Sequence, residues 1–258
     1  MEYTKAVVSA AEKSDSPVIL MLGQPILKFA GLDTLANIAL FAAKRATVPA
    51  AVLLDHGSDP NYIERAIELG MSIMVDGSHY SFDENVRFTR KYVKIAHARN
   101  LSVEGELGAL AGSEDGEAER QSQMTDPTLA AQFVKQTGVD VLAVSIGNSH
   151  GLYKGKPKID IDRLISIKKK VDVPIVMHGG SDLPDEISKE LINNGMSKFN
   201  IGTDLKIAFS SAMREALSTD PIRFQPFDSL QYAMDKTEEK AMEKIVAFNS
   251  GNKASLYK

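Results

Sequence analysis

The sequence contains no cysteine and no tryptophan. The absence of cysteine excludes disulfides and thiolate metal ligands, so any metal site must use histidine and carboxylate side chains. The chain also lacks an apolar run near the roughly 20 residues that a membrane span requires, and Met1–Ser14 has no signal-peptide core. We therefore predict a cytoplasmic protein with no membrane partner.

The sequence also has no large excess of charge of either sign. Its 30 Lys and Arg stand against 34 Asp and Glu, which gives a formal net charge of -4 at pH 7. This balance provides no general attraction for nucleic acid, so we predict no nucleic-acid partner. With 43% hydrophobic and 25% charged residues, the composition is typical of a folded domain with a sizeable core.

Short apolar runs rich in β-branched residues alternate with longer amphipathic stretches. This alternation is typical of βαβ units and a parallel sheet. It predicts seven strands, at Pro17–Leu22, Ala50–Leu54, Ser72–Val75, Leu101–Glu106, Val139–Ile146, Pro174–Met177 and Ser197–Ile201. The helices predicted between or before them include Met1–Glu12, Asn61–Leu69, Asp83–Arg99, Thr128–Thr137 and one that begins at Pro184–Glu186.

This pattern predicts an α/β protein of the (β/α)8 or TIM-barrel class, with residues 1–258 forming a single barrel domain. The length agrees with the roughly 250 residues typical of such a barrel. A closed barrel has eight strands, whereas the pattern indicates seven and opens directly on a helix. The first barrel strand is therefore predicted to be missing.

Three of the five histidines share one sequence context. His56, His150 and His178 each end an apolar strand run, and a glycine follows each of them. Because the carboxyl ends of barrel strands meet at one face, where catalytic groups collect, we expect the three imidazoles to converge. Three nitrogen ligands with one open position are typical of a catalytic metal site. Zinc is the default ion, although imidazoles also suit cobalt, iron and nickel.

The alternative for any one of these histidines is a hydrogen bond to a loop. Three equivalent positions among so few histidines favour the metal interpretation. His79 and His97 lack this context, and we expect structural roles for them.

Asp55 directly precedes the first of the three histidines. Neighbouring strand residues point to opposite faces, so Asp55 and His56 can serve one site only if the chain leaves regular strand geometry, as Gly57 permits. There Asp55 would act either as a general acid/base or as the group that orients a neighbouring histidine.

A second acidic segment follows the strand that ends at Glu104-Gly105-Glu106. It leads into the glycine-rich loop LGALAGSEDG, which is long for a connection between strand and helix. Glu114 and Asp115 in this loop would either carry a base into a closed site, as a lid does, or form a solvated acidic surface.

Glycines and hydroxyls after the last two predicted strands indicate an anion site. Backbone N–H groups near helix N-termini bind anions, and barrel phosphate sites are often built from these two loops. The residues concerned are Gly179, Gly180 and Ser181 after His178, then Asn200, Ile201, Gly202 and Thr203, with Gly151 after His150 and Lys154 nearby. A metal beside a phosphate site suits an aldolase, an epimerase or a phosphohydrolase.

Six segments, taken together, resemble the class II (metal-dependent) fructose-/tagatose-bisphosphate aldolase family. They are LLDHG (53–57), MVDGSH (74–79), SVEGELGALAGSEDG (102–116), TGVDVLAVSIGNSHGLYKGKPKID (137–160), PIVMHGGS (174–181) and KFNIGTDL (198–205). The resemblance covers essentially the whole chain.

This resemblance implies a zinc-dependent lyase that acts on a phosphorylated sugar. It would reversibly cleave fructose 1,6-bisphosphate or tagatose 1,6-bisphosphate to dihydroxyacetone phosphate and glyceraldehyde 3-phosphate through a metal-stabilised enediolate. His56, His150 and His178 look like the ligands of the catalytic Zn2+, for which other divalent metals can substitute. Asp76 and Glu106 resemble ligands of an alternative, second metal position.

The remaining roles are implied in the same way. Asp55 looks like the acid/base on the aldehyde/hydroxyl oxygen, and Glu114 looks like the lid-borne carboxylate that exchanges the enolate proton. The pocket for dihydroxyacetone phosphate would comprise Gly151, Gly179, Gly180, Ser181, Asn200, Ile201, Gly202 and Thr203. A monovalent cation (Na+ or K+) is expected nearby, and the assembly is expected to be a homodimer or homotetramer.

The sequence departs from the family pattern at several places. An AVGAFNV-like first strand with its substrate-pocket Asn has no counterpart, and Met21–Gln24 lacks the usual polar pair at a strand end. Asp182 replaces a usual Gly, and its carboxylate would either repel a substrate phosphate or cap the next helix. Ala111 replaces a second usual Gly, in the predicted lid loop. Two alternatives therefore stay open: a non-catalytic metal-binding paralogue or assembly subunit, and an aldolase for another phosphorylated ketose.

Overall fold

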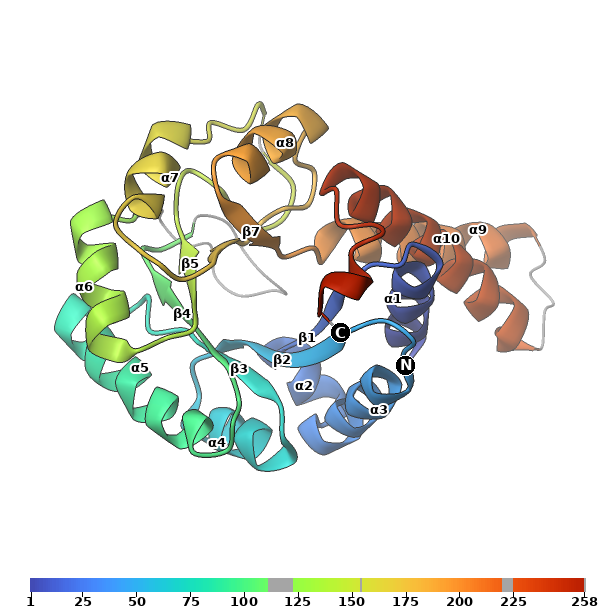
Figure 1. Ribbon diagram of the computed structural model, residues 1–258. Helices are drawn as coiled ribbons and strands as arrows, with labels where there is room; N and C mark the ends of the chain where they lie inside the picture. The colour runs from blue at the N-terminus through green and yellow to red at the C-terminus, as the bar shows by residue number, and fades with distance from the viewer. Residues whose placement is uncertain (111–122, 154, 220–224, 258) are drawn as a thin grey trace. The chain divides into compact units, whose positions relative to one another are not determined.

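The computed structural model describes residues 1–110, 123–153, 155–219 and 225–257 (Figure 1). The elements in chain order are α1 (Glu2–Lys13), β1 (Val18–Gly23), α2 (Gln24–Ala30), α3 (Leu32–Arg45), β2 (Ala50–Gly57), α4 (Pro60–Leu69), β3 (Ser72–Val75), α5 (Phe82–His97), β4 (Val103–Leu107), α6 (Pro127–Thr137), β5 (Val141–Val144), α7 (Ile161–Lys168), β6 (Ile175–Met177), α8 (Asp185–Asn193), β7 (Met196–Phe199), α9 (Thr203–Thr219), α10 (Pro226–Ala247) and a final 3-10 turn (Ala254–Tyr257).

The seven described strands form one sheet whose spatial order is the chain order, β1 to β7. Each strand from β2 to β6 pairs in parallel with the next. Sequential parallel strands joined by helices are the arrangement of a (β/α) barrel. The predicted fold class and all seven predicted strands are confirmed, with ends that differ by up to three residues.

The described residues divide into two compact units. One comprises Met1–Leu20, Asn37–Ala51 and Ile201–Lys258, and the other comprises Met21–Ala36 and Val52–Asn200. A single barrel domain over residues 1–258 therefore stays a prediction.

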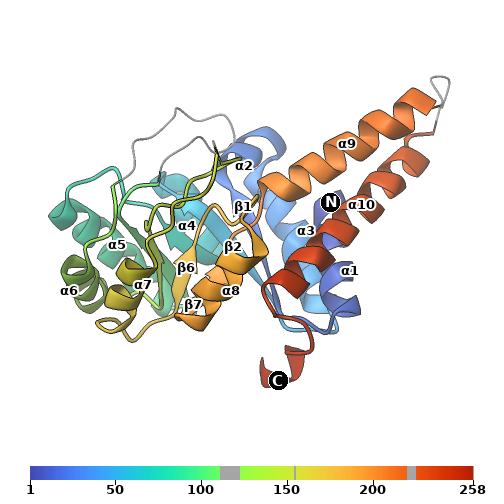
Figure 2. The same ribbon diagram turned by 90° about the horizontal axis from the view of Figure 1, so that it is seen from above.

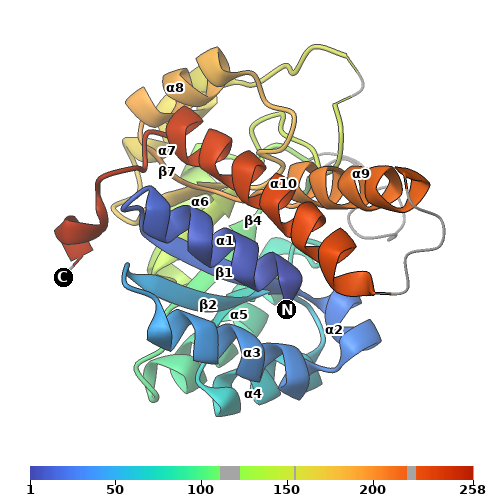
Figure 3. The ribbon, with the colours of Figure 1, turned by 90° about the vertical axis from the view of Figure 1, so that its right-hand side faces the viewer.

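In the first unit, α9 and α10 pack along each other (Figure 2). Helix α1 packs against α10 (Figure 3). A small core of Ala11, Val48 and Ala254 is buried in this unit.

In the second unit, α4 to α8 lie outside the strands (Figure 1). A buried cluster of Leu53, Met74, Ala143 and Val176 fills the inner face of the sheet. Fully burying a leucine, methionine or valine side chain contributes about 1.5–3 kcal/mol.

Polar residues follow this apolar layer at a spacing of two. Because strand side chains alternate between faces, the next residue on the same face lies two positions further along. For the four cluster residues, these positions are Asp55, Asp76, Ser145 and His178, and all four are buried. The strand period therefore directs polar groups to the carboxyl ends of the inner face.

Side-chain caps begin two helices of this unit. Asp126 accepts hydrogen bonds from the backbone N–H groups of Thr128 and Leu129, and Pro127 occupies the first turn of α6. A capping box between Ser81 and Glu84 begins α5.

Among the described residues, no single helix is long and apolar enough to cross a membrane. One pair of helices, α2 and α3, is together long and apolar enough for a membrane span by length and composition alone. The pair is bent by 108°.

Candidate metal centre

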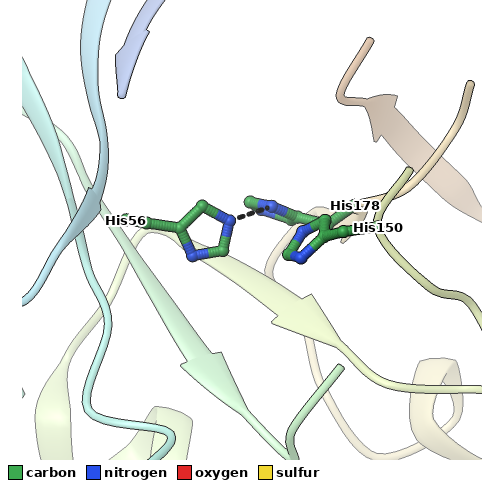
Figure 4. Close-up of side chains that lie close together, drawn as sticks. All are labelled: His56, His150 and His178. Atoms are coloured by element: carbon green, nitrogen blue, oxygen red, sulfur yellow. Dashed lines mark hydrogen bonds between the residues drawn. The ribbon is translucent and has the colours of Figure 1, made fainter. Parts of the chain in front are cut away.

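Three strand ends in the second unit bring His56, His150 and His178 together (Figure 4). His56 lies near the end of β2, His150 lies in the loop after β5, and His178 directly follows β6. One ring nitrogen from each lies within 4.8 Å of the others. Ring centroids are 4.6 Å apart for His56 and His178 and 5.0 Å apart for His56 and His150. The three imidazoles converge, as strand-end placement predicts.

The backbone at His56 leaves regular strand geometry. His56 has a φ of 46°, and the pairing of β2 with β3 shifts register between Leu54 and Gly57. A left-handed non-glycine residue is a local strain that the surrounding structure must hold in place. The expected irregularity is present, but it falls on His56 itself. Gly57 instead permits close packing, because a Cβ there would lie 2.6 Å from the Met74 carbonyl oxygen.

A carboxylate orients the His56 ring. His56 Nδ1 lies 2.9 Å from Asp76 Oδ2, and Asp76 Oδ1 accepts hydrogen bonds from the Ser78 N–H and hydroxyl. Burial by itself would raise the pKa of Asp76, but the hydrogen bonds from His56 and from Ser78 hold that pKa below its usual value. An ionised carboxylate only accepts hydrogen bonds, so Nδ1 of His56 carries the proton and Nε2 presents its lone pair.

The His178 ring is held as the opposite tautomer. Its Nε2 lies 2.9 Å from Glu104 Oε1, so Nε2 donates and Nδ1 presents the lone pair. His56 Nε2 and His178 Nδ1 then face each other at 2.8 Å (Figure 4). Two lone pairs at this distance repel unless a cation or proton lies between them. A tetrahedral zinc with nitrogen ligands at about 2.0–2.1 Å spaces those nitrogens about 3.3 Å apart, so the donor set fits a zinc ion after a small opening.

A second set of possible ligands lies on the other side of His56. His56, Asp76 and Glu106 also bring ligand atoms within 4.8 Å of one another. Glu106 Oε2 is 3.5 Å from His56 Nδ1, and both carboxylates are buried. Their role as an alternative metal position stays a prediction. In the described structure, Asp76 orients His56.

The loops after β5 and β6 touch at Gly179. A Cβ on Gly179, whose φ is 68°, would lie 2.0 Å from the Ser149 carbonyl oxygen. Asn148 Nδ2 donates to the His178 carbonyl oxygen at 2.9 Å, and the Tyr153 hydroxyl donates to the Gly179 carbonyl oxygen at 2.9 Å. These contacts join the two loops that carry His150 and His178.

Replacing Gly179 with alanine is expected to lower the free energy of unfolding by at least about 2 kcal/mol, because backbone strain and a steric clash add. Gly70→Ala is the matched control, since Gly70 also has a positive φ but a Cβ there meets nothing within 4 Å. The control should cost about 1 kcal/mol. Urea denaturation of both variants measures the difference, and equal losses would show that the contact with Ser149 is unimportant.

Three further predicted pocket residues, Gly180, Ser181 and Asn200, either follow His178 closely in the chain or contact its ring. Ser181 is buried, and the Gly180 N–H donates to the Asn200 carbonyl oxygen at 3.1 Å. Asn200 Nδ2 lies 3.0 and 3.2 Å from the two ring nitrogens of His178, which places the amide over the ring face. Within the described residues, Asn200 Oδ1 is buried without a hydrogen-bond partner.

The roles of the other predicted site residues stay predictions. Gly151 has a φ of 82° in the loop after β5, and its contact with substrate stays a prediction. Ile201, Gly202 and Thr203 belong to the first unit, and their roles also stay predictions. Predictions for Glu114, Asp115, Ala111 and Lys154 fall outside the described residues.

Asp182 does not cap the helix that follows it. Helix α8 has Pro184 at its N-cap and no side-chain capping bond. Asp182 has a φ of 56°, and its Oδ2 accepts from the Tyr153 N–H at 3.3 Å. Burial, together with the negative charge of Asp182, raises the pKa of Tyr153 to about 12, against a hydrogen bond from the Ser149 backbone. The left-handed backbone explains why a glycine suits this position.

Among the described residues, the candidate ligand cluster includes neither His79 nor His97, and their structural roles stay predictions. Exposed His97 contacts Asp140, with Nε2 2.9 Å from Oδ2, and the His79 ring packs on Tyr80. Sequence reasoning assigned no role to Glu104 or to Lys198, which contacts it. The sequence signal that could have indicated a role for both residues is a charged side chain at a strand position that faces inward.

Parallel strands with three histidines at their ends define the class of metal-dependent barrel proteins. Comparison with known proteins is more specific. The model of the class-II fructose-bisphosphate aldolase family matches residues 1–253. The chain therefore belongs to the class II fructose-bisphosphate aldolase family, whose members are metal-dependent lyases.

Individual relatives agree with this family. The chain is 38% identical over 259 residues to a fructose-bisphosphate aldolase from Geobacillus stearothermophilus, covering 99% of this chain and 90% of that protein. It is also 38% identical over 259 residues to a sulfofructosephosphate aldolase from Alkalicoccus urumqiensis, with the same coverage. The crystal structure of the YdjI aldolase from Escherichia coli K12 matches with a TM-score of 0.85 and 33% identity, over 98% of this chain and 90% of that chain.

Proposed function

We propose that the protein is a zinc-dependent ketose-bisphosphate aldolase that reversibly cleaves fructose 1,6-bisphosphate or tagatose 1,6-bisphosphate to dihydroxyacetone phosphate and glyceraldehyde 3-phosphate. The observation that carries the proposal is the convergence of three histidines, two of which have their lone pairs aimed at one point by buried carboxylates. A three-nitrogen site with an open position is the arrangement of a catalytic metal.

His56, His150 and His178 would hold the metal. When bound, zinc would supply Lewis-acid stabilisation of the negative charge that develops on substrate oxygens during carbon–carbon cleavage. Other divalent ions suit the same donors. The backbone at Gly151, Gly179–Ser181 and Asn200–Thr203 would bind the phosphate of dihydroxyacetone phosphate, with Na+ or K+ nearby.

Two carboxylates would move the protons. Asp55, which is 6% exposed, would take the proton from the substrate hydroxyl during cleavage and return it to the aldehyde oxygen during synthesis. Glu114 would exchange the proton at the carbon that becomes the hydroxymethyl group of dihydroxyacetone phosphate. The substrate hydroxyl would therefore exchange its proton with Asp55, and the substrate carbon would exchange its proton with Glu114.

The test is production of dihydroxyacetone phosphate from each bisphosphate by the purified chain, followed with a coupled reductase. We expect turnover that a chelator abolishes and that added zinc restores. Absence of product from both sugars, with and without zinc, would contradict the proposal.

An aldolase for another phosphorylated ketose is the second candidate. The relative named a sulfofructosephosphate aldolase is as similar to this chain as the Geobacillus fructose-bisphosphate aldolase. Asp182 beside the predicted phosphate loop also distinguishes this pocket from the usual family pattern. A panel in which dihydroxyacetone phosphate is held constant and the aldehyde is varied decides between them.

A non-catalytic metal-binding or assembly subunit would bind zinc yet give no product with any member of that panel. A cytoplasmic location and a homodimeric or homotetrameric state accompany the proposed enzyme as predictions.

A further inference from the structure

A buried line of polar contacts runs from His178 to a lysine on another strand. Glu104 Oε1 lies 2.9 Å from His178 Nε2, and Glu104 Oε2 lies 2.8 Å from Lys198 Nζ. Side-chain exposure is 1% for His178, 3% for Glu104 and 14% for Lys198. Both oxygens of the one carboxylate are thus engaged, one by the imidazole and one by the ammonium group.

The sheet register explains how these residues meet. Glu104 on β4 pairs with Val141 on β5, and Lys198 on β7 pairs with Val176 on β6. Strands β4 and β7 are not neighbours in the sheet, since β5 and β6 lie between them. The two side chains therefore meet across the inner face of the sheet, beside the apolar layer that contains Val176.

The burial of two charged groups, Glu104 and Lys198, is energetically costly and requires an explanation. Removing an ammonium group and a carboxylate from water costs several kcal/mol per ion, and replacing a buried pair by apolar residues is often neutral or stabilising. The pair is therefore weak grounds for fold stability. The pair instead fixes the orientation of the Glu104 carboxylate. When one carboxylate oxygen is held by the ammonium group, the other oxygen faces the imidazole at a fixed angle.

We propose that Lys198 is a positioning residue of the metal centre: it fixes Glu104 so that Glu104 holds His178 as the Nε2–H tautomer, with Nδ1 aimed at the metal. This inference deepens the proposed function and rests on it for the identity of the centre. The two contacts of Glu104, at 2.9 Å to His178 Nε2 and at 2.8 Å to Lys198 Nζ, are the geometry on which the inference rests.

The acceptor character of the carboxylate determines the tautomer. Glu104 Oε2 accepts from the Lys198 ammonium group and Oε1 faces His178 Nε2, so Nε2 is the donor and the second nitrogen keeps the only lone pair of the ring. If Glu104 rotates away, either nitrogen can carry the proton, and a fraction of the molecules presents N–H to the metal. Groups that orient metal-bound histidines in this way typically contribute 10–100-fold to metal affinity.

The experiment compares Lys198→Met with Lys198→Arg, which retains a cation, and with Lys189→Met, which removes an exposed lysine on α8. Two quantities are measured: the tautomer of His178 in metal-free protein, from histidine 15N chemical shifts, and the zinc dissociation constant, from competition with a chromophoric chelator. We expect Nε2–H in the wild type and in Lys189→Met.

For Lys198→Met, we expect a mixture of tautomers and zinc affinity weaker by about 10–100-fold. Lys198→Arg should largely restore both values. Glu104→Gln is the second variant, useful if Lys198→Met does not fold, because the amide can donate to Nε2 and should shift His178 towards the Nδ1–H form.

The inference is overturned if His178 is Nδ1–H in the wild type, or if Lys198→Met changes neither tautomer nor zinc affinity while remaining folded. These outcomes are separate from the fate of the proposed function. A wild type that has the expected tautomers but cleaves no ketose phosphate rejects the function and keeps the positioning role.

Discussion

Replacing His178 with alanine is expected to weaken zinc binding by more than about 100-fold, beyond the 10–100-fold typical of a group that only orients a ligand. His178 would provide one of three ligand nitrogens, and two neutral imidazoles from His56 and His150 would hold the ion poorly. Cleavage activity should fall with the zinc content. Metal analysis of the desalted protein after incubation with one equivalent of zinc measures this effect.

The control for this variant is His97→Ala, which removes an exposed histidine that contacts Asp140. It should bind zinc like the wild type. Circular dichroism of both variants checks that the fold persists. A folded His178→Ala protein that retains a full equivalent of zinc at wild-type affinity would show that the ion, if any, lies elsewhere.

The second large effect is expected for Asp55→Asn, which should lower kcat by about 10²–10⁴-fold, the usual contribution of a general acid/base. The amide preserves the shape of this buried side chain but cannot take up a proton. Because Asp55 is not among the three proposed ligands, zinc content should remain at one equivalent. Steady-state production of dihydroxyacetone phosphate and metal analysis on the same sample separate the two properties.

Asp162→Asn is the matched control, since Asp162 is exposed in the first turn of α7. It should leave kcat unchanged. A wild-type kcat in Asp55→Asn would remove Asp55 from the proton transfer. It would then favour a structural role for this carboxylate beside the metal.

The positions of the strands were predictable from the sequence because short apolar runs punctuated by helix signals have few other interpretations. The convergence of His56, His150 and His178 followed from the same pattern, since parallel strands bring their carboxyl ends to one edge. Helix α6 was predictable because Asp126-Pro127 is a strong start signal.

Other features depend on information that a local pattern does not contain. The left-handed backbone of His56 lies at a register shift between β2 and β3. The Glu104–Lys198 pair joins strands that are not neighbours, so it follows only from the sheet as a whole. The bond from the Tyr153 N–H to Asp182 likewise requires two loops to meet.

The most direct test of a catalytic three-histidine metal centre is a zinc titration of chelator-stripped protein, with the rate of dihydroxyacetone phosphate formation as the signal. We expect no turnover without metal, a linear rise with added zinc, and a plateau at one equivalent per chain. Full turnover in the stripped protein, or no turnover at any zinc concentration with either bisphosphate, would contradict this expectation.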